Sequence, residues 1–254
     1  MLNSDLFLRY QRQVALEEVG ESGQQRLIEA SVLLIGCGGL GCAAALYLAG
    51  AGVGRLVLVD DDTVEVSNLQ RQVAYRSGDI ASRKSQALRN QLNQLNPEVH
   101  IRALNQRISA TQLSMEVMMA DVVLDCTDNF PSRQAINLAC LQQRKPLITA
   151  AAIGWLGQFS VFDYTAGDSA TACYHCVYPF DDAEQSQRCS DLGVMGPVVG
   201  ILGNYQALAA IQKLATGRFH LARNQLHLFD GLTMTWQTVN AVRDAHCAHC
   251  SNMA

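Results

Sequence analysis

The amino-acid sequence predicts an α/β fold in which a mainly parallel β-sheet carries helices on both faces. Apolar runs of strand length alternate with longer helical patterns along most of the chain, which is typical of successive βαβ units. Two long uncharged stretches, at 32–54 and 192–212, fit this fold because strands buried on both faces are apolar throughout. With 254 residues, 49% of them hydrophobic and 17% charged, the chain can bury one large core.

The elements of the first half follow from periodicity and turn residues. An N-terminal helical segment is expected at 6–19, and a helix beginning near Lys84 should end at Asn96, because the residue before Pro97 disfavours helix. Residues 61–80 are polar and irregular, which is long for such a connection and indicates function. The other expected elements are strands Ser31–Ile35, Arg55–Asp60, Val99–Leu104, Asp121–Cys126 and Pro146–Ala151, and helices Leu40–Ala49, Ala110–Met119 and Pro131–Gln143.

The sequence changes character after Gly154. Residues 158–164 alternate between apolar and polar side chains like an antiparallel strand, and a loop rich in Cys, Asp and Gln follows at 165–191. A long apolar helix is expected at 198–215, before strands at 225–230 and 234–239. The predicted fold is therefore α/β with antiparallel strands at its C-terminal end.

Composition and charge exclude several classes of function. The formal net charge is −4 and no run of Lys or Arg exceeds two residues, so we expect no nucleic-acid partner. The two uncharged stretches contain many glycines and lack flanking positive clusters, so we expect no membrane span. The N-terminus lacks a signal-type apolar core, which predicts a cytoplasmic protein with reduced cysteines.

A glycine-rich turn is the first candidate binding element. Gly36-x-Gly38-Gly39-x-Gly41 follows an expected strand and opens an expected helix, and Asp60 ends the next strand. Glycines allow close approach of a phosphate, the helix start offers free amides, and Asp60 can accept hydrogen bonds from ribose hydroxyls. The pattern predicts a nucleotide site in a Rossmann-like sheet, but it does not distinguish NAD from ATP.

Charged residues at the same expected edge of the sheet favour a triphosphate. Arg71 and Lys84 provide two cations, which a hydride-transfer site does not need and which would offset charge developing on phosphates. Asp128 follows the fourth expected strand and can hold Mg²⁺ that bridges phosphate oxygens. Taken singly, the two cations also fit solvated surface charges, and Asp128 fits a helix cap.

Five runs of sequence resemble a known family: Arg9-Tyr-Gln-Arg-Gln13, Gly36-Cys-Gly-Gly-Leu-Gly41, Ser67-Asn-Leu-Gln-Arg-Gln72, Lys84-Ser85 and Cys126-Thr-Asp-Asn129. The chain resembles, over essentially its whole length, the ThiF/MoeB/HesA family of ubiquitin-activating-like adenylyltransferases. The resemblance implies ATP-dependent adenylylation of the C-terminal glycine carboxylate of a small ubiquitin-fold sulfur-carrier protein, with release of pyrophosphate. It also implies one domain, 1–254, with a nucleotide-binding half at about 1–152 and a carrier- and zinc-binding half at about 153–254.

The resemblance assigns roles to single positions. Arg12 would reach the triphosphate from the neighbouring subunit of a homodimer, although alone it fits a surface arginine equally well. Arg12, Arg71, Lys84 and Asp128 are the expected catalytic residues around the triphosphate. The expected nucleotide contacts are Gly39, Gly41, Asp60, Ser67, Asn68, Leu69, Gln70, Arg71, Lys84, Asp128 and Asn129.

The runs at 194–200 and 228–231 are closer to ThiF-type than to MoeB-type sequence. This favours a ThiS-like carrier of thiamine thiazole biosynthesis, with a MoaD-like carrier of the molybdopterin pathway as the alternative. A sulfur-donor protein is a further expected partner.

Two Cys-x-x-Cys pairs, Cys173 with Cys176 and Cys247 with Cys250, can place four thiolates on one tetrahedral ion. An iron–sulfur cluster and two disulfides are the alternatives. The same pairs recur in the family, which implies structural zinc. His175 and His249 lie inside the pairs and are expected outside the ligand set.

The other cysteines divide into two groups. Cys37, Cys42, Cys126 and Cys140 lie within apolar patterns and are expected to be buried. Cys189 lies in a polar segment beside Arg188, which favours its thiolate, and it matches the family cysteine that takes the activated carrier.

Two functions of other classes share part of this pattern. An NAD-dependent oxidoreductase would share the glycine turn and Asp60. It leaves four residues unexplained: Arg12, Arg71, Lys84 and Asp128. A non-catalytic zinc scaffold that binds nucleotide would need those residues for affinity alone.

Overall fold

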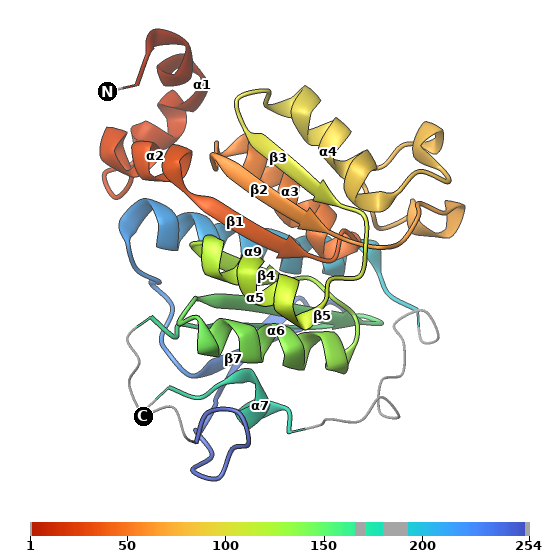
Figure 1. The fold of residues 1–254 in the computed structure, drawn as a ribbon, viewed down its shortest axis with the longest axis vertical. Coiled ribbons are helices and arrows are strands. Elements are labelled where there is room, and N and C mark those ends of the chain that lie inside the picture. The colour runs from red at the N-terminus through yellow and green to blue at the C-terminus, as the bar shows by residue number, and fades with distance from the viewer. Residues whose placement is uncertain (1, 166–170, 180–192, 252–254) are drawn as a thin grey trace.

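The computed structural model describes residues 2–165, 171–179 and 193–251 (Figure 1). Eight strands form one sheet in the order β3-β2-β1-β4-β5-β6-β7-β8. The parallel part comprises β1 (Ser31–Ile35), β2 (Arg55–Val59), β3 (His100–Leu104), β4 (Val122–Asp125) and β5 (Leu147–Ile153). Antiparallel strands β6 (Leu156–Phe162), β7 (Gln225–Asp230) and β8 (Thr235–Asn240) extend it. The predicted fold class is confirmed.

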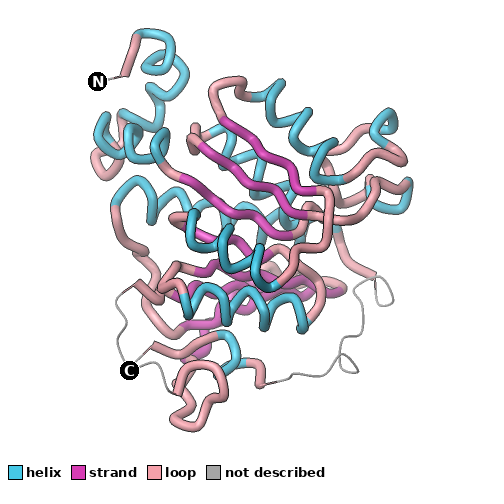
Figure 2. The backbone as a smooth tube through the Cα atoms, viewed as in Figure 1, coloured by secondary structure: helices cyan, strands magenta, loops and turns pink. Residues whose placement is uncertain are grey.

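Helices cover both faces of the sheet (Figure 2). Alternation along β1 shows why, because Val32 and Leu34 enter one core while Leu33 and Ile35 enter the other. The first face carries α3 (Gly39–Gly50), α4 (Lys84–Leu95) and the long α9 (Gly196–Thr216). The opposite face carries α5 (Ala110–Met119) and α6 (Phe130–Gln142).

The long uncharged stretches are accounted for by this core. Residues 32–54 form β1 and the buried helix α3, and the described part of 192–212 lies largely in α9. Among the described residues, none of the helices combines the length and hydropathy needed to cross a bilayer.

The N-terminal segment differs from the prediction. The single helical segment expected at 6–19 is α1 (Ser4–Val14), and a second helix, α2 (Gly20–Glu29), follows it. Glycine and polar residues dominate α2, and Leu27 and Ile28 are its only apolar residues. Tertiary contacts stabilise it instead: the buried Gln24 donates to the carbonyl of Ala51 at 3.0 Å.

The connections are also more ordered than the sequence indicates. Short 3₁₀ turns at Val66–Asn68 and Ser77–Asp79 divide the irregular segment 61–80. A short helix, α7 (Tyr174–Val177), lies within the loop expected at 165–191.

Candidate nucleotide site and cysteine cluster

The carboxyl ends of β1, β2 and β4 lie at the same level of the sheet. Ile35 is in register with Val59 on one side and with Asp125 on the other. The chain therefore leaves these strands at one edge, and we call the turns at 36–41, 60–62 and 126–129 the rim. Open α/β sheets bind ligands at this edge.

The glycine turn of the rim is built by close backbone contacts. Gly36 has a φ of +96°, and a Cβ at that position would lie 2.6 Å from the carbonyl oxygen of Cys126. A Cβ on Gly41 would lie 1.9 Å from the carbonyl oxygen of Gly36. Gly38 is the N-cap of α3 and supplies no side-chain cap, so the first turn of the helix can present its N–H groups to an anion.

Asp60 faces the glycine turn. One carboxylate oxygen accepts a hydrogen bond from the Cys37 backbone N–H at 2.7 Å, and the other accepts from the Asp62 N–H at 2.9 Å. Burial raises the pKa of Asp60, although these two hydrogen bonds and the charge of Lys84 act in the opposite direction. The structure therefore brings this carboxylate to the glycine turn, as the motif predicts.

Lys84 lies at the same rim. Its side chain is buried, and Nζ donates to Asp62 Oδ2 at 2.8 Å. Burial alone lowers the pKa of Lys84, but the hydrogen bond to Asp62 and the charges of Asp60 and Asp62 raise it, so the ammonium is retained. The surface-charge interpretation of Lys84 is wrong.

Residues 67–71 pack between the glycine turn and the start of α9. A Cβ on Gly39 would lie 3.3 Å from the Arg71 carbonyl oxygen, and one on Gly196 would lie 2.7 Å from that of Gln70. The half-buried Arg71 donates from Nη1 to the Ser67 carbonyl at 3.0 Å. Asn68 is buried and Leu69 packs against the core, so the segment is fixed beside the rim.

Asp128 and Asn129 occupy the turn after β4. Asn129, not Asp128, caps α6: its side chain accepts from the Ser132 N–H at 3.0 Å. The capping interpretation of Asp128 is therefore wrong. The Asp128 side chain is exposed and accepts from Asn129 Nδ2 at 3.3 Å.

Tyr75, which the sequence analysis did not single out, contacts the rim. Its buried hydroxyl lies 2.7 Å from the Cys37 carbonyl oxygen and 3.2 Å from that of Lys84. It therefore ties the glycine turn to the start of α4. The one feature of the sequence that could have pointed to Tyr75 is that it is an aromatic residue inside the polar segment 61–80.

Arg12 does not join these residues within one chain. It is exposed on α1, which lies at the amino ends of the strands (Figure 1). The neighbouring Tyr10 packs against Gly52 and accepts from Asn96 Nδ2 at 2.8 Å, and both partners lie in connections that enter strands. The rim lies at the opposite ends.

The four predicted metal-binding cysteines come together. Their Sγ atoms are separated by 3.8 Å between Cys173 and Cys176, 3.6 Å between Cys173 and Cys247, and 3.5 Å between Cys176 and Cys250. Four thiolates about 2.3 Å from a tetrahedral ion would be about 3.8 Å apart. The set fits a closed metal site, and all four are free thiols, so the disulfide alternative is wrong.

The two histidines inside the cysteine pairs lie beside the cluster. His175 is buried, with Nδ1 3.4 Å from Cys247 Sγ, and the ring of His249 is 4.2 Å from that of His175. Asn137 Nδ2 is 3.1 Å from Nδ1 of His249.

The remaining cysteines match their expected burial where the structure describes them. Cys37, Cys42, Cys126 and Cys140 are buried. Burial raises the pKa of each thiol, that of Cys42 to about 12. Cys189 lies outside the described residues.

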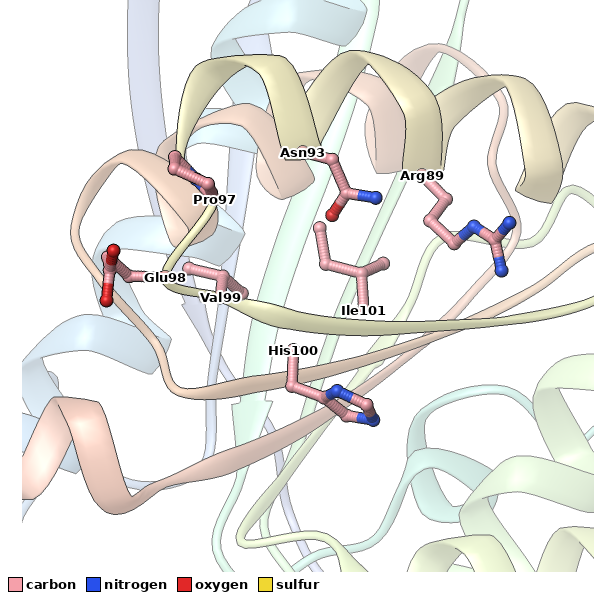
Figure 3. Close-up of a pocket in the computed structure, with 7 residues that line it drawn as sticks. All are labelled: Arg89, Asn93, Pro97, Glu98, Val99, His100 and Ile101. Atoms are coloured by element: carbon pink, nitrogen blue, oxygen red, sulfur yellow. The ribbon is translucent and has the colours of Figure 1, made fainter.

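Two cavities lie outside the rim. A cavity of about 450 Å³ lies between α4 and β3, where Arg89, Asn93 and Ile101 are among its lining residues (Figure 3). A second, of about 300 Å³, includes Arg102 and Glu116. Neither cavity is lined by a predicted site residue. The candidate site is therefore the rim and not one of these cavities.

Several known proteins are similar to this chain in sequence or in structure. The ThiF family matches residues 10–251. Sulfur carrier protein ThiS adenylyltransferase of Escherichia coli (strain K12) is 47% identical over 98% of this chain and 97% of its own length. Molybdopterin-synthase adenylyltransferase of the same organism is 37% identical over 98% of each. A crystal structure of E. coli MccB with MccA-N7isoASN has a TM-score of 0.81 at 22% identity over 98% of this chain and 75% of that one, which supports the fold alone.

The eight-stranded sheet with helices on both faces defines a protein of the Rossmann-like α/β class. The chain belongs to the ThiF family, and it is an adenylyltransferase. The alternative of an NAD-dependent oxidoreductase is not favoured by these comparisons.

Proposed function

We propose that this enzyme adenylylates the C-terminal glycine carboxylate of a ThiS-like ubiquitin-fold sulfur-carrier protein, using ATP and releasing pyrophosphate. The observation that carries the proposal is the convergence of Asp60, Lys84 and Asp128 on one rim around the glycine turn. The 47% identity to an enzyme named for ThiS favours this carrier. A MoaD-like carrier is the second candidate, because a molybdopterin-synthase adenylyltransferase is 37% identical.

The residues of the rim fit the parts of ATP. Amides at Gly39 and Gly41 would face phosphate, and Asp60 would accept from the ribose hydroxyls. Arg71 and Lys84 would balance the negative charge of the triphosphate. The remaining nucleotide contacts would come from Ser67, Asn68, Leu69, Gln70 and Asn129. In this assignment 1–152 binds nucleotide, and 153–254 binds the carrier and the metal.

The reaction follows from leaving-group chemistry. The ionised carboxylate of the carrier attacks the α-phosphorus, the bond to the β-phosphate oxygen breaks, and pyrophosphate leaves. No general base is required, because the nucleophile is already an anion. The task of the protein is to align anionic partners and to offset their charge.

Asp128 would hold Mg²⁺ at this site. Its exposed carboxylate at the rim offers the hard oxygen ligand that Mg²⁺ prefers, together with room for phosphate oxygens. When bound, Mg²⁺ would neutralise phosphate charge.

The position of Arg12 supports a homodimer with composite sites. Since α1 lies at the amino ends of its own strands, Arg12 would meet a triphosphate only at the rim of a neighbouring subunit. In phosphoryl-transfer enzymes an arginine from a neighbouring protein contributes roughly 10³ to 10⁵ in rate. We expect a comparable order here by analogy.

The four-cysteine cluster would hold structural zinc. Closed sets of four thiolates are typical of structural zinc sites, and this one joins α7 to the C-terminal segment. A set of reduced cysteines also supports a cytoplasmic enzyme.

Cys189 would accept the activated carrier before sulfur is delivered by a donor protein. Its thiolate would attack the acyl carbon of the adenylate, forming a thioester and releasing AMP. The substitution Cys189→Ala should preserve carrier-dependent exchange between ATP and pyrophosphate but abolish the covalent carrier adduct. Normal sulfur transfer by this variant would remove Cys189 from the reaction.

Mass spectrometry of the carrier tests the function. The enzyme is mixed with ATP, Mg²⁺ and either a ThiS-like or a MoaD-like carrier, and we expect the ThiS-like carrier alone to gain the mass of AMP. Asp128→Ala should abolish this product, while Glu98→Ala, an exposed acid at the amino edge, should not. AMP on the MoaD-like carrier would select the second candidate. The absence of both AMP on a carrier and a covalent adduct of a carrier with the enzyme would overturn the proposal.

A further inference from the structure

A buried arginine lies beneath the turn that carries Asp128. Arg133 is in the first turns of α6 and is 5% exposed. Its Nη2 donates to the carbonyl of Thr127 and, at 3.0 Å, to that of Ala150. Its Nη1 donates to Thr149 Oγ1 at 3.3 Å. One guanidinium on α6 is therefore bonded to the rim turn and to the middle of β5.

Asp125 is the anionic partner of this guanidinium. It is 1% exposed, and its Oδ2 lies 3.8 Å from Arg133 Nη1 and accepts from Thr149 Oγ1 at 3.0 Å. Its Oδ1 accepts from the Thr127 N–H at 3.0 Å and from Thr127 Oγ1 at 2.7 Å. Thr127 is thus held at its N–H and hydroxyl by Asp125 and at its carbonyl by Arg133.

We call Arg133 and Asp125, which together hold Thr127, the clamp. Thr127 directly precedes Asp128, so the clamp affects the position of the exposed carboxylate. Within the described part of the chain, the hydrogen bond that Asp128 accepts on its side chain comes from its neighbour Asn129. The Asp128 side chain is exposed, so none of the elements that the structure describes packs over it. Its place at the rim therefore depends on the backbone at Thr127.

Stability alone does not explain why Arg133 and Asp125 form an ion pair in the buried core. Burying two charges costs desolvation, and an apolar pair of similar volume is often at least as stable. What the guanidinium supplies that an apolar side chain lacks is a set of directed hydrogen bonds to two other segments, the rim turn and β5. Such bonds fix geometry, which is what a metal ligand on an exposed turn requires.

We propose that Arg133 is a positioning residue for the metal–triphosphate site: through Thr127 it sets where the Asp128 carboxylate lies. The inference rests on the proposed function, in which Asp128 receives Mg²⁺ together with ATP. Arg133 itself contacts neither the nucleotide nor the carrier.

The test compares nucleotide binding with and without metal. Calorimetry gives the affinity for a non-hydrolysable ATP analogue in Mg²⁺ and in EDTA, and the ratio of the two affinities is the metal-dependent gain. Arg133→Lys keeps a charge opposite Asp125 but cannot reach all its acceptors at once. We expect this gain to fall by roughly 10- to 100-fold, the usual effect of losing a group that orients a metal ligand, with the affinity in EDTA little changed.

Two further variants separate positioning from loss of fold. Thr127→Val deletes only the hydroxyl hydrogen bond to Asp125 and should also lower the metal-dependent gain. If Arg133→Lys does not fold, this variant tests the inference in its place. Lys213→Met removes the ion pair with Asp163, at 3.1 Å between largely buried side chains, and should leave the gain unchanged. Folded Arg133→Lys or Thr127→Val protein with the wild-type gain would overturn the inference.

Catalysis provides the independent comparison. In carrier-dependent ATP–pyrophosphate exchange, Arg133→Lys should lower kcat and raise the Mg²⁺ concentration required, while the KM for the carrier stays unchanged. If wild-type enzyme shows no exchange with any carrier, the proposed function fails, yet the calorimetric comparison still decides the role of Arg133.

Discussion

Gly36 and Cys126 are in contact through their backbones: a Cβ on Gly36 would lie 2.6 Å from the Cys126 carbonyl oxygen. The glycine turn after β1 and the Asp128 turn after β4 therefore touch. The absence of a side chain at position 36 therefore sets the spacing between the amides at the start of α3, which we propose bind phosphate, and the Asp128 carboxylate, which we propose holds the metal.

We predict that Gly36→Ala lowers both stability and nucleotide affinity. The residue has a φ of +96°, and the added methyl group would meet backbone, which cannot rotate away. Strain and overpacking should together lower the free energy of unfolding by at least about 2 kcal/mol, measured by urea denaturation. Gly50→Ala is the matched control: its Cβ meets nothing within 4 Å at the end of α3, and it should be neutral or slightly stabilising. Equal effects of the two substitutions would contradict this account.

A second prediction concerns the four-cysteine cluster. Purified enzyme should contain one zinc ion per chain, and Cys176→Ser should lose it, because one of four thiolates is removed. Since the ion would join α7 to the C-terminal segment, its loss should lower Tm on the order of 10 °C. Cys140→Ser, a buried thiol outside the cluster, should retain zinc. The zinc content of the two variants is measured by atomic absorption. One zinc ion per chain in Cys176→Ser would exclude the proposed ligand set.

The rim was predictable because its residues follow strands directly. Parallel strands end at one edge, so Gly36, Asp60 and Asp128 had to emerge close together once the strands were placed. The cysteine cluster was predictable for another reason: two short pairs leave few other arrangements for four thiolates.

The clamp beneath the rim was not predictable in the same way. Asp125, Arg133 and Thr149 come from β4, α6 and β5, and no spacing in the sequence links them. Helix α2 was missed for a related reason, because its support is tertiary, as in the bond from Gln24 to the Ala51 carbonyl. Contacts between distant segments determine both features, whereas periodicity reports only local structure.

A third prediction follows from the raised pKa of Asp60. Burial lifts the pKa above the ordinary value of 3.8, and ribose hydroxyls donate to the ionised form. Nucleotide affinity should therefore fall as pH drops through this raised pKa, by up to tenfold per pH unit. For folding the sign is opposite: the folded state holds this proton more tightly, so the group's contribution to stability decreases as pH rises from the unfolded to the folded pKa.

Titration of wild-type and Asp60→Asn enzyme with ATP from neutral to acidic pH tests this prediction. The variant should bind weakly, and the ratio of the two affinities should shrink toward low pH; using the ratio cancels the ionisation of the nucleotide itself. Parallel pH profiles would show that Asp60 does not carry the dependence.

The last prediction is that Arg12 acts across a dimer. Arg12→Ala and Asp128→Ala chains should each lack exchange activity, because each site would need Arg12 from one subunit and Asp128 from the other. In an equal mixture that exchanges subunits freely, half of the dimers are mixed and one of their two sites is intact, so activity should return to about a quarter of the wild-type value. A mixture of Lys84→Ala with Asp128→Ala is the control: both residues belong to one rim, so it should recover nothing. Failure of the first mixture, like the control, to recover activity would place Arg12 in its own chain's site, and a monomeric enzyme would remove the composite site altogether.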